Sequence, residues 1–194
     1  MHMADSFSID TTKTALVVID LQKGIVAGVT EPHASADVVK NAAALADAFR
    51  KKQMPVFLVH VTPSADGKDG LAPLVDAPMK FGPRAADWAE FVPELHQASD
   101  DFVITKRQWG AFYGTELDLQ LRRRNIDTIV LCGISTNIGV ESTARDAYER
   151  GYHQIFAEDA NAARSAEEHV HAMQGIFKRI GRVRSTKEIL AALA

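Results

Sequence analysis

The sequence is poor in cysteine. Cys132 is the single one among 194 residues, which excludes an intramolecular disulfide and a cysteine-based metal cluster. Long apolar runs are also missing, since none approaches the about 18 residues that suggest a membrane-spanning helix. The first ten residues show no basic region followed by an apolar stretch, as a secretory leader would. We therefore expect a cytoplasmic protein that binds no membrane.

An excess of positive charge is absent too. The formal net charge is -3, and the basic residues are scattered apart from one run, Arg122, Arg123 and Arg124. Such a run is typical of a helix end, where cations offset the helix dipole, so we expect no nucleic-acid partner. With 46% hydrophobic and 24% charged residues, the composition is that of a globular protein. Residues 1–194 fit one domain, in which 1–11 form an N-terminal extension.

Short apolar runs rich in β-branched residues predict buried strands, because parallel strands covered on both faces carry continuous apolar sequence. The runs cover residues 14–20, 55–61, 102–106, 128–132, 154–158 and 182–185. Helical patterns separate them, and this alternation favours right-handed crossovers onto a parallel sheet. We predict an α/β fold, a three-layer α/β/α sandwich around a six-stranded parallel sheet with strand order 3-2-1-4-5-6.

Capping signals mark where the helices begin. The stretch 35–52 places apolar residues at helical spacing, and Ser35 is its expected N-cap. A helix over 137–150 should be followed by Gly151 at the position after its C-terminus. Capping boxes predict the starts of three more helices, at 115–118, 165–168 and 185–188.

The segment 62–101 departs from this alternation. It holds five prolines, at positions 63, 73, 78, 83 and 93, and shows only weak periodicity. Connections of that length are usually functional, so we expect a lid or a wall of the substrate pocket. Within it, Arg84 and Trp88 are candidates for a carboxylate contact and a pocket wall, although surface exposure is the favoured interpretation of both.

Polar or small residues end three of the predicted strands abruptly. Asp20 closes the first, Lys106 the third and Gly133 the fourth. Ligands of open parallel sheets bind beyond the carboxyl ends of the strands, so an acid, a base and a helix start would converge there. Each residue alone is more often a helix cap or a loop anchor, and only their combination predicts a site.

Two longer motifs carry a resemblance to a known family. They are "ALVVIDLQKG", with Asp20 and Gln22, and "ITKRQWGAFYGTELDLQLRRRNIDTIVLCGISTNIGVESTARDAYERGY", with Lys106 and Phe112. Over residues 12–193 the sequence resembles the isochorismatase-like, or cysteine hydrolase, superfamily, and within it the YecD-type bacterial members. The resemblance implies a triad of aspartate, lysine and a nucleophilic cysteine, the last in a motif G-x-x-T-x-x-C-V at a helix start.

The matching stretch, residues 133–140, has Gly139 where the cysteine is expected. Glycine has no side chain that could attack a substrate, so covalent thiol catalysis at this position is excluded. Cys132 does not replace the missing nucleophile. It lies within a predicted strand, where we interpret it as a small buried hydrophobic residue. The isochorismatase branch of the superfamily also has glycine there, and it hydrolyses a vinyl ether without a covalent intermediate.

Carried over by position, Asp20 is the general acid, Lys106 its electrostatic partner and Gly139 the vacated nucleophile position. A lysine about 4 Å away favours the ionised carboxylate by about 4 kcal/mol at an effective dielectric near 20, whereas a general acid must be protonated. Burial of Asp20 must therefore compensate. The resemblance further implies a cis peptide bond between Ile134 and Ser135.

Pocket-lining roles are expected for residues beside these three positions. Apolar and turn residues suit a substrate pocket with few polar groups, although core packing is equally consistent with Phe112. The candidates for substrate binding are Gln22, Trp109, Phe112, Ile134, Ser135 and Ile138.

Metal and cofactor are both expected to be absent. Nicotinamidase-like members hold a metal with an aspartate and two histidines, but no second histidine follows His60 closely. His169 and His171 are two positions apart on a predicted helix and face away from each other, so we expect both to be solvated. His33 has no assigned role.

These residues predict a hydrolase of a small metabolite, anionic or neutral, that acts without a covalent thiol intermediate. Two alternatives stay open, namely an amidase in which Asp20 activates water and a non-catalytic ligand-binding protein on a retired hydrolase scaffold. Members of the superfamily commonly associate, so a homo-oligomer is expected.

Overall fold

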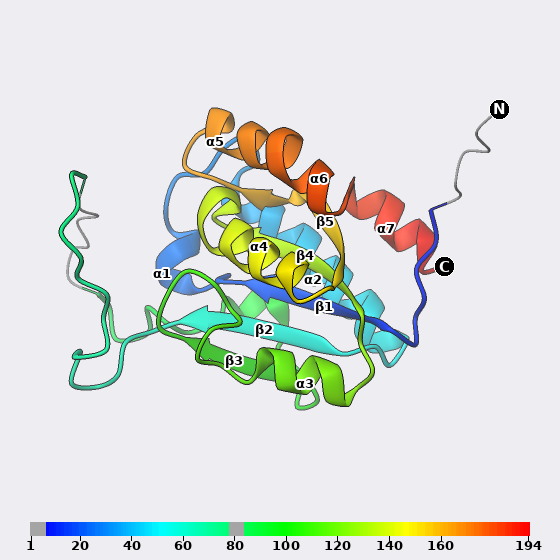
Figure 1. The fold of residues 1–194 in the computed structure, drawn as a ribbon, viewed down its shortest axis with the longest axis horizontal. Helices are drawn as coiled ribbons and strands as arrows, with labels where there is room; N and C mark the ends of the chain where they lie inside the picture. The colour runs from blue at the N-terminus through cyan, green and yellow to red at the C-terminus, as the bar shows by residue number, and fades with distance from the viewer. Residues whose placement is uncertain (1–6, 78–83) are drawn as a thin grey trace.

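The computed structural model describes residues 7–77 and 84–194, and its centre is a parallel sheet (Figure 1). The strand order β3-β2-β1-β4-β5-β6 and the six strands confirm the predicted α/β/α sandwich. β1 lies in the middle with all of its residues buried, as expected for a strand covered on both faces. The strands are β1 (Thr14–Ile19), β2 (Val56–Val61), β3 (Phe102–Lys106), β4 (Thr128–Ile134), β5 (His153–Ala162) and β6 (Arg182–Arg184).

Helices cover both faces of the sheet (Figure 1). One core cluster packs α2 (Ser35–Lys51) and α7 (Thr186–Ala192) against residues such as Leu16 and Val18 of β1. The second cluster packs the other layer against the alternate residues of β1. That layer consists of α3 (Leu117–Arg123), α4 (Glu141–Glu149), α5 (Ala166–Val170), η3 (His171–Phe177) and α6 (Lys178–Ile180).

The ends of the helices follow the capping signals in part. The capping box at 185–188 is present in α7, and the Ser165 hydroxyl accepts a hydrogen bond from the Glu168 amide at the start of α5. Gly151 follows α4 with φ of 81°, as a residue after a helix end requires. In α3, the run Arg122, Arg123 and Arg124 occupies the last turn and the C-cap, as expected.

Two predicted N-caps are wrong. Ala34 is the N-cap of α2, while Ser35 is its first residue and donates its hydroxyl proton to the Gly28 carbonyl. α3 begins at Leu117 after Glu116, and no capping box forms with Thr115. The Thr115 hydroxyl instead donates to the Ala111 carbonyl and accepts from the Leu117 amide, since short polar side chains bond local backbone groups in many geometries.

The fourth crossover starts later than its periodicity predicts. A wide helical turn, η2 (Thr136–Val140), connects β4 to α4, so regular α-helix begins only at Glu141. Such π-type turns occur frequently at functional sites. The turn contains Gly139, which places it at the end of the sheet where the site is expected.

The segment 62–101 is anchored beside α1 (Lys23–Val26). Lys23 forms ion pairs with Asp87 at 3.0 Å and with Glu90 at 2.7 Å. The half-buried ring of Trp88 lies directly on Gly24, so the expected surface exposure of Trp88 is wrong. Arg84 is exposed, as expected, and lies over the Trp88 ring at 4.4 Å from its centre. A short turn, η1 (Pro93–Leu95), then returns the chain to the core.

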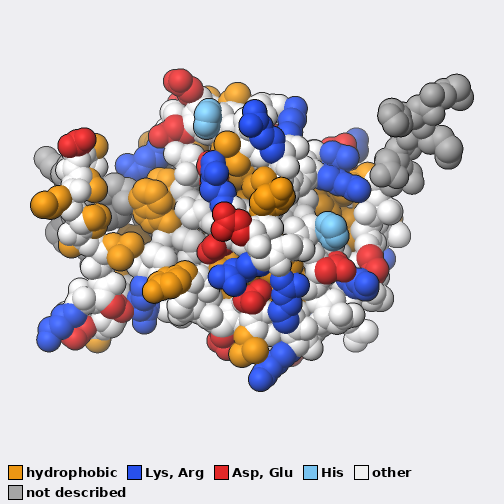
Figure 2. Space-filling model, in the orientation of Figure 1, with side chains coloured by type: hydrophobic (Ala, Val, Ile, Leu, Met, Phe, Trp, Pro, Cys, Tyr) orange, Lys and Arg blue, Asp and Glu red, His pale blue; other side chains and the backbone are white. Residues whose placement is uncertain are grey.

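Residues 62–77 project from the body of the molecule as an arm (Figure 1). Its apolar side chains Leu71, Leu74 and Val75 are exposed, and hydrophobic atoms gather on this projection in Figure 2. Pro78 and Pro83 of the same segment lie outside the described residues. Across 7–77 and 84–194, every helix is too short or too polar to cross a bilayer.

Candidate functional site

Three distant chain positions meet beyond the carboxyl ends of the central strands. Asp20 follows β1, Lys106 ends β3, and Gly139 lies in η2 after β4. The Lys106 Nζ atom lies 2.8 Å from Asp20 Oδ2. A Cβ atom built on Gly139 would lie 3.0 Å from Asp20 Oδ2 and 3.3 Å from Lys106 Nζ. The carboxyl and the ammonium group therefore border the space that a side chain at position 139 would occupy.

Asp20 is held in an unusual backbone conformation. Its φ of 55° is in the left-handed region, which costs energy for a residue with a side chain and is often kept at functional sites. The Asp20 amide donates to the Val59 carbonyl at 2.9 Å, which fixes the residue to the end of β2. These constraints aim the carboxyl group towards Lys106 and the turn that contains Gly139.

The protonation of Asp20 is tuned by burial. Its surface is only 5% exposed, and the loss of water raises the carboxyl pKa from 3.8 to about 6. Lys106 opposes this by charge and by hydrogen bonding, but burial dominates. The Oδ1 atom is buried without a hydrogen-bond partner among the described residues. A carboxyl group with such a pKa exchanges protons readily near neutral pH.

Lys106 is among the most deeply buried charged side chains, with 1% of its surface exposed. Besides Asp20, its Nζ donates to the Trp109 carbonyl at 2.6 Å. Two oxygen acceptors thus compensate for the removal of the ammonium group from water. Trp109 therefore contributes its backbone carbonyl here, while the residue as a whole is 53% exposed.

The turn that contains Gly139 is fixed by a residue that sequence reasoning missed. The Thr143 hydroxyl donates to the Gly139 carbonyl at 2.7 Å and accepts from the Ala111 amide at 3.1 Å. Threonine often bonds the carbonyl four residues earlier in a helix, but the contact with Ala111 has no local signal in the sequence. The cis peptide bond between Ile134 and Ser135 is present, as the resemblance implies.

Other expected pocket residues differ in their surroundings. Gln22 is fully buried, and its amide donates to the Val61 carbonyl and accepts from the Val61 amide. This differs from the substrate contact expected of Gln22, because both of its polar atoms are bonded to β2. Phe112 packs in the second core cluster and Ile134 in the first. Ser135 and Ile138 are half-buried in the turn.

Cys132 is buried inside β4, and burial raises the pKa of its thiol to about 12. A thiol in that state supplies no thiolate nucleophile. The interpretation of Cys132 as a buried hydrophobe is therefore confirmed.

Two surface hollows lie away from Asp20. One of about 570 Å³ is lined by His60, Phe91 and Val103, and one of about 720 Å³ by residues of α2 together with Val26 and Val92. Neither is bordered by Asp20, Lys106 or Gly139.

His169 is not the solvated residue that helical position predicts. Its side chain is 1% exposed, with Nδ1 2.9 Å from the Thr136 hydroxyl and Nε2 3.1 Å from Glu158 Oε1. His33 Nε2 lies 3.0 Å from the same Glu158 oxygen. Sequence spacing gave no sign of this cluster, because His33 and Glu158 are 125 positions apart.

Comparisons with known proteins agree with this architecture. An isochorismatase domain model matches residues 14–188. YwoC of Bacillus subtilis, an isochorismatase family protein, is 55% identical over 190 residues, which cover 97% of this chain and 98% of the relative. YecD of Escherichia coli O157:H7, from the same family, is 55% identical over 180 residues, 93% of this chain and 96% of the relative.

A solved structure extends the likeness to three dimensions. An isochorismatase family protein from Burkholderia thailandensis superposes with a TM-score of 0.92 at 45% identity, covering 96% of this chain and 97% of the other. Residues 14–188, which the domain model matches, include every strand and the turn that contains Gly139. The chain belongs to the isochorismatase family of hydrolases.

Proposed function

We propose that the protein hydrolyses a small metabolite, anionic or neutral, without a covalent intermediate, at the site formed by Asp20, Lys106 and Gly139. The observation that carries this proposal is the buried Asp20–Lys106 pair beside Gly139, since a Cβ at position 139 would lie 3.0 Å from Asp20 Oδ2 and 3.3 Å from Lys106 Nζ. A substrate atom held over Gly139 lies within hydrogen-bonding reach of an acid, because no side chain at position 139 stands between it and Asp20.

In the proposed reaction, the protonated Asp20 carboxyl transfers its proton to the enol-ether carbon of a vinyl ether. Water adds to the resulting oxocarbenium ion and returns one proton to the Asp20 carboxylate, which gives a hemiketal. The hemiketal then breaks its bond to the leaving oxygen as its hydroxyl proton passes to that oxygen, so that the products are a carbonyl compound and an alcohol. Lys106 stabilises the carboxylate that forms, since it donates a hydrogen bond to Oδ2. A pKa of about 6 leaves a usable fraction of the acid protonated near neutral pH.

The same pKa supports a second candidate, an amidase in which the ionised Asp20 takes a proton from water that attacks a carbonyl. Near neutral pH both protonation states of Asp20 are populated, so the group can serve as acid or base. Assays with a panel of amides and a panel of enol ethers separate the two reactions. If the protein turns over neither panel and binds metabolites tightly, the retired-scaffold alternative replaces both.

Replacement of Asp20 by asparagine tests the role of the carboxyl. We expect Asp20→Asn to lower kcat/KM by about 10²- to 10⁴-fold with the chain still folded, because the amide cannot transfer the proton. Asp127→Asn is the matched control, since this aspartate precedes β4 and lies at the opposite end of the sheet. Full activity of Asp20→Asn, with circular dichroism spectra alike, would remove the proposed acid and base roles together.

We also propose that copies of the chain associate. The arm, residues 62–77, exposes Leu71, Leu74 and Val75, and contiguous apolar patches on a surface often mark contacts with other proteins. The cytoplasmic location expected from the sequence stays a prediction.

A further inference from the structure

A bulge in β5 aims Glu158 out of the sheet. Leu131 of β4 pairs with Phe156 and Gly133 pairs with Asn161, so β5 has four residues where β4 has one. The Asn161 amide closes this bulge by donating to the Ala157 carbonyl at 2.6 Å. Bulges beside active sites commonly re-aim a side chain, and here the redirected carboxylate of Glu158 meets two imidazoles.

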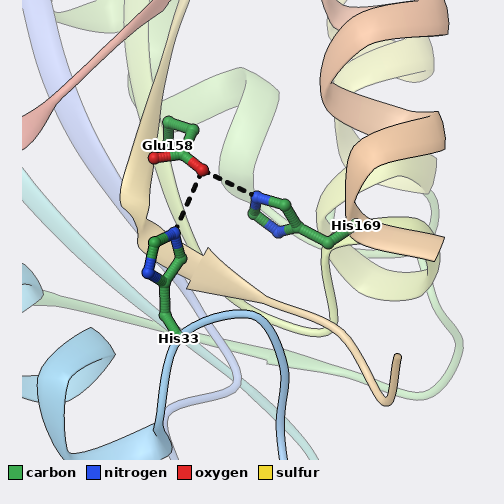
Figure 3. A group of neighbouring side chains, drawn as sticks. All are labelled: His33, Glu158 and His169. Atoms are coloured by element: carbon green, nitrogen blue, oxygen red, sulfur yellow. Dashed lines mark hydrogen bonds and ion pairs between the residues drawn. The ribbon is translucent and has the colours of Figure 1, made fainter. Parts of the chain in front are cut away.

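The imidazoles come from segments far apart in the chain. His169 lies on α5 and His33 on the loop before α2, and both point towards Glu158 in Figure 3. Their Nε2 atoms are 3.1 and 3.0 Å from the one oxygen Oε1, and the three ligand atoms all lie within 4.8 Å of one another. Ligand atoms of one tetrahedral metal ion are each about 2.0 to 2.2 Å from the ion and therefore about 3.3 to 3.6 Å apart, which is close to the two separations from Oε1.

The environment of the cluster also suits a metal. His169 Nδ1 is 2.9 Å from the Thr136 hydroxyl, and metal-binding histidines usually bond a second group through their other ring nitrogen. His169 is buried, whereas Glu158 and His33 are 36% and 28% exposed, which leaves one side open to water.

We propose that His33, Glu158 and His169 form a binding site for a divalent transition-metal ion. Two neutral imidazoles and one carboxylate form a ligand set typical of Zn²⁺ and of its first-row neighbours, and the exposed side provides a position for water. This proposal departs from the absence of metal expected from the sequence. That expectation rested on His60, His169 and His171, whereas the cluster joins His169 to His33 and Glu158.

The metal site is linked to the turn that contains Gly139. When Nε2 of His169 coordinates the ion, its Nδ1 must carry the ring proton and donate a hydrogen bond to the Thr136 hydroxyl oxygen. Thr136 is the first residue of η2, which contains Gly139. Without metal, both Nε2 atoms must instead carry protons in order to bond Oε1, so the tautomer of His169 distinguishes the two states.

Zinc titration of the full, untagged chain tests the proposal. After dialysis against a chelator, isothermal titration calorimetry with Zn²⁺ should show one ion per chain. His33→Ala and Glu158→Gln should each weaken Zn²⁺ binding by at least about 100-fold. Loss of a group that only supports a ligand already costs up to about 100-fold, and these residues are proposed as ligands themselves. Both side chains are partly exposed, so circular dichroism should show folded variants.

His171→Ala is the matched control, because this exposed histidine lies two positions from His169 and outside the cluster. It should bind Zn²⁺ as the unmodified chain does. A second readout is the visible absorption of bound Co²⁺, which reports coordination by nitrogen and oxygen independently of enzymatic activity. Absence of Zn²⁺ binding up to about 1 mM, an affinity near −4 kcal/mol, or binding that survives both cluster variants, would overturn the proposal.

Discussion

At the residue scale, the chemistry depends on how burial and charge compete at Asp20. Burial raises the pKa of this carboxyl to about 6, and Lys106 holds it from rising further. An acid must be protonated to act, so kcat/KM of an acid-catalysed reaction should fall as the pH rises through about 6. A base must be ionised, so the amidase alternative should show kcat/KM rising through the same region. Measured pH–rate profiles separate the two by the sign of the slope.

Lys106→Met sharpens this prediction. Loss of the ammonium charge removes the factor that lowers the pKa of Asp20, so the inflection of the profile should move to higher pH. The conservative Lys106→Arg keeps a positive charge and should move it less. An unchanged inflection in Lys106→Met would mean that another group titrates in the profile.

At the scale of the elements, the contact between β1 and β4 requires glycine at position 133. Gly133 has φ of +133°, and a Cβ there would lie 2.0 Å from the Ile19 carbonyl oxygen. Gly133→Ala should therefore lower the free energy of unfolding by more than about 4 kcal/mol, or abolish folding, because backbone atoms must move. Chemical denaturation measures the change.

Gly151→Ala is the matched variant for this experiment. Gly151 also has a positive φ, +81°, but nothing lies within 4 Å of its Cβ position. The substitution should cost only about 1 to 2 kcal/mol, the energy of a left-handed conformation for a residue with a side chain. Equal losses in the two variants would show that the approach of β1 to β4 is unimportant.

At the scale of the whole molecule, the arm, residues 62–77, projects from the body of the domain (Figure 1). Leu71 and Leu74 are exposed on it, and we expect them to be covered by a second copy. The double substitution Leu71→Asp and Leu74→Asp should shift the mass measured by light scattering towards the monomer. Leu119→Asp, on exposed α3, is the control and should leave the mass unchanged. A monomeric unmodified chain would refute association through the arm.

The sequence by itself determined the parallel α/β architecture, and it predicted which residues follow the strands at the edge where we propose the site. Continuous apolar runs identify strands buried on both faces, and a polar residue after such a run, as at Asp20 and Lys106, marks the carboxyl end of a strand. The glycine at position 139 likewise excludes thiol catalysis there, because glycine has no side chain that could act as a nucleophile. These features are local, so one sequence suffices to read them.

Only the tertiary structure decided which groups meet. The raised pKa of Asp20 depends on burial by several elements, the role of Gln22 on the backbone of β2, and the bond of Thr143 to Ala111 on a loop 32 positions away. His33, Glu158 and His169 come together because a bulge turns β5, and neither composition nor periodicity contains that information. Contacts between distant segments arise from packing, whose geometry a linear pattern does not encode.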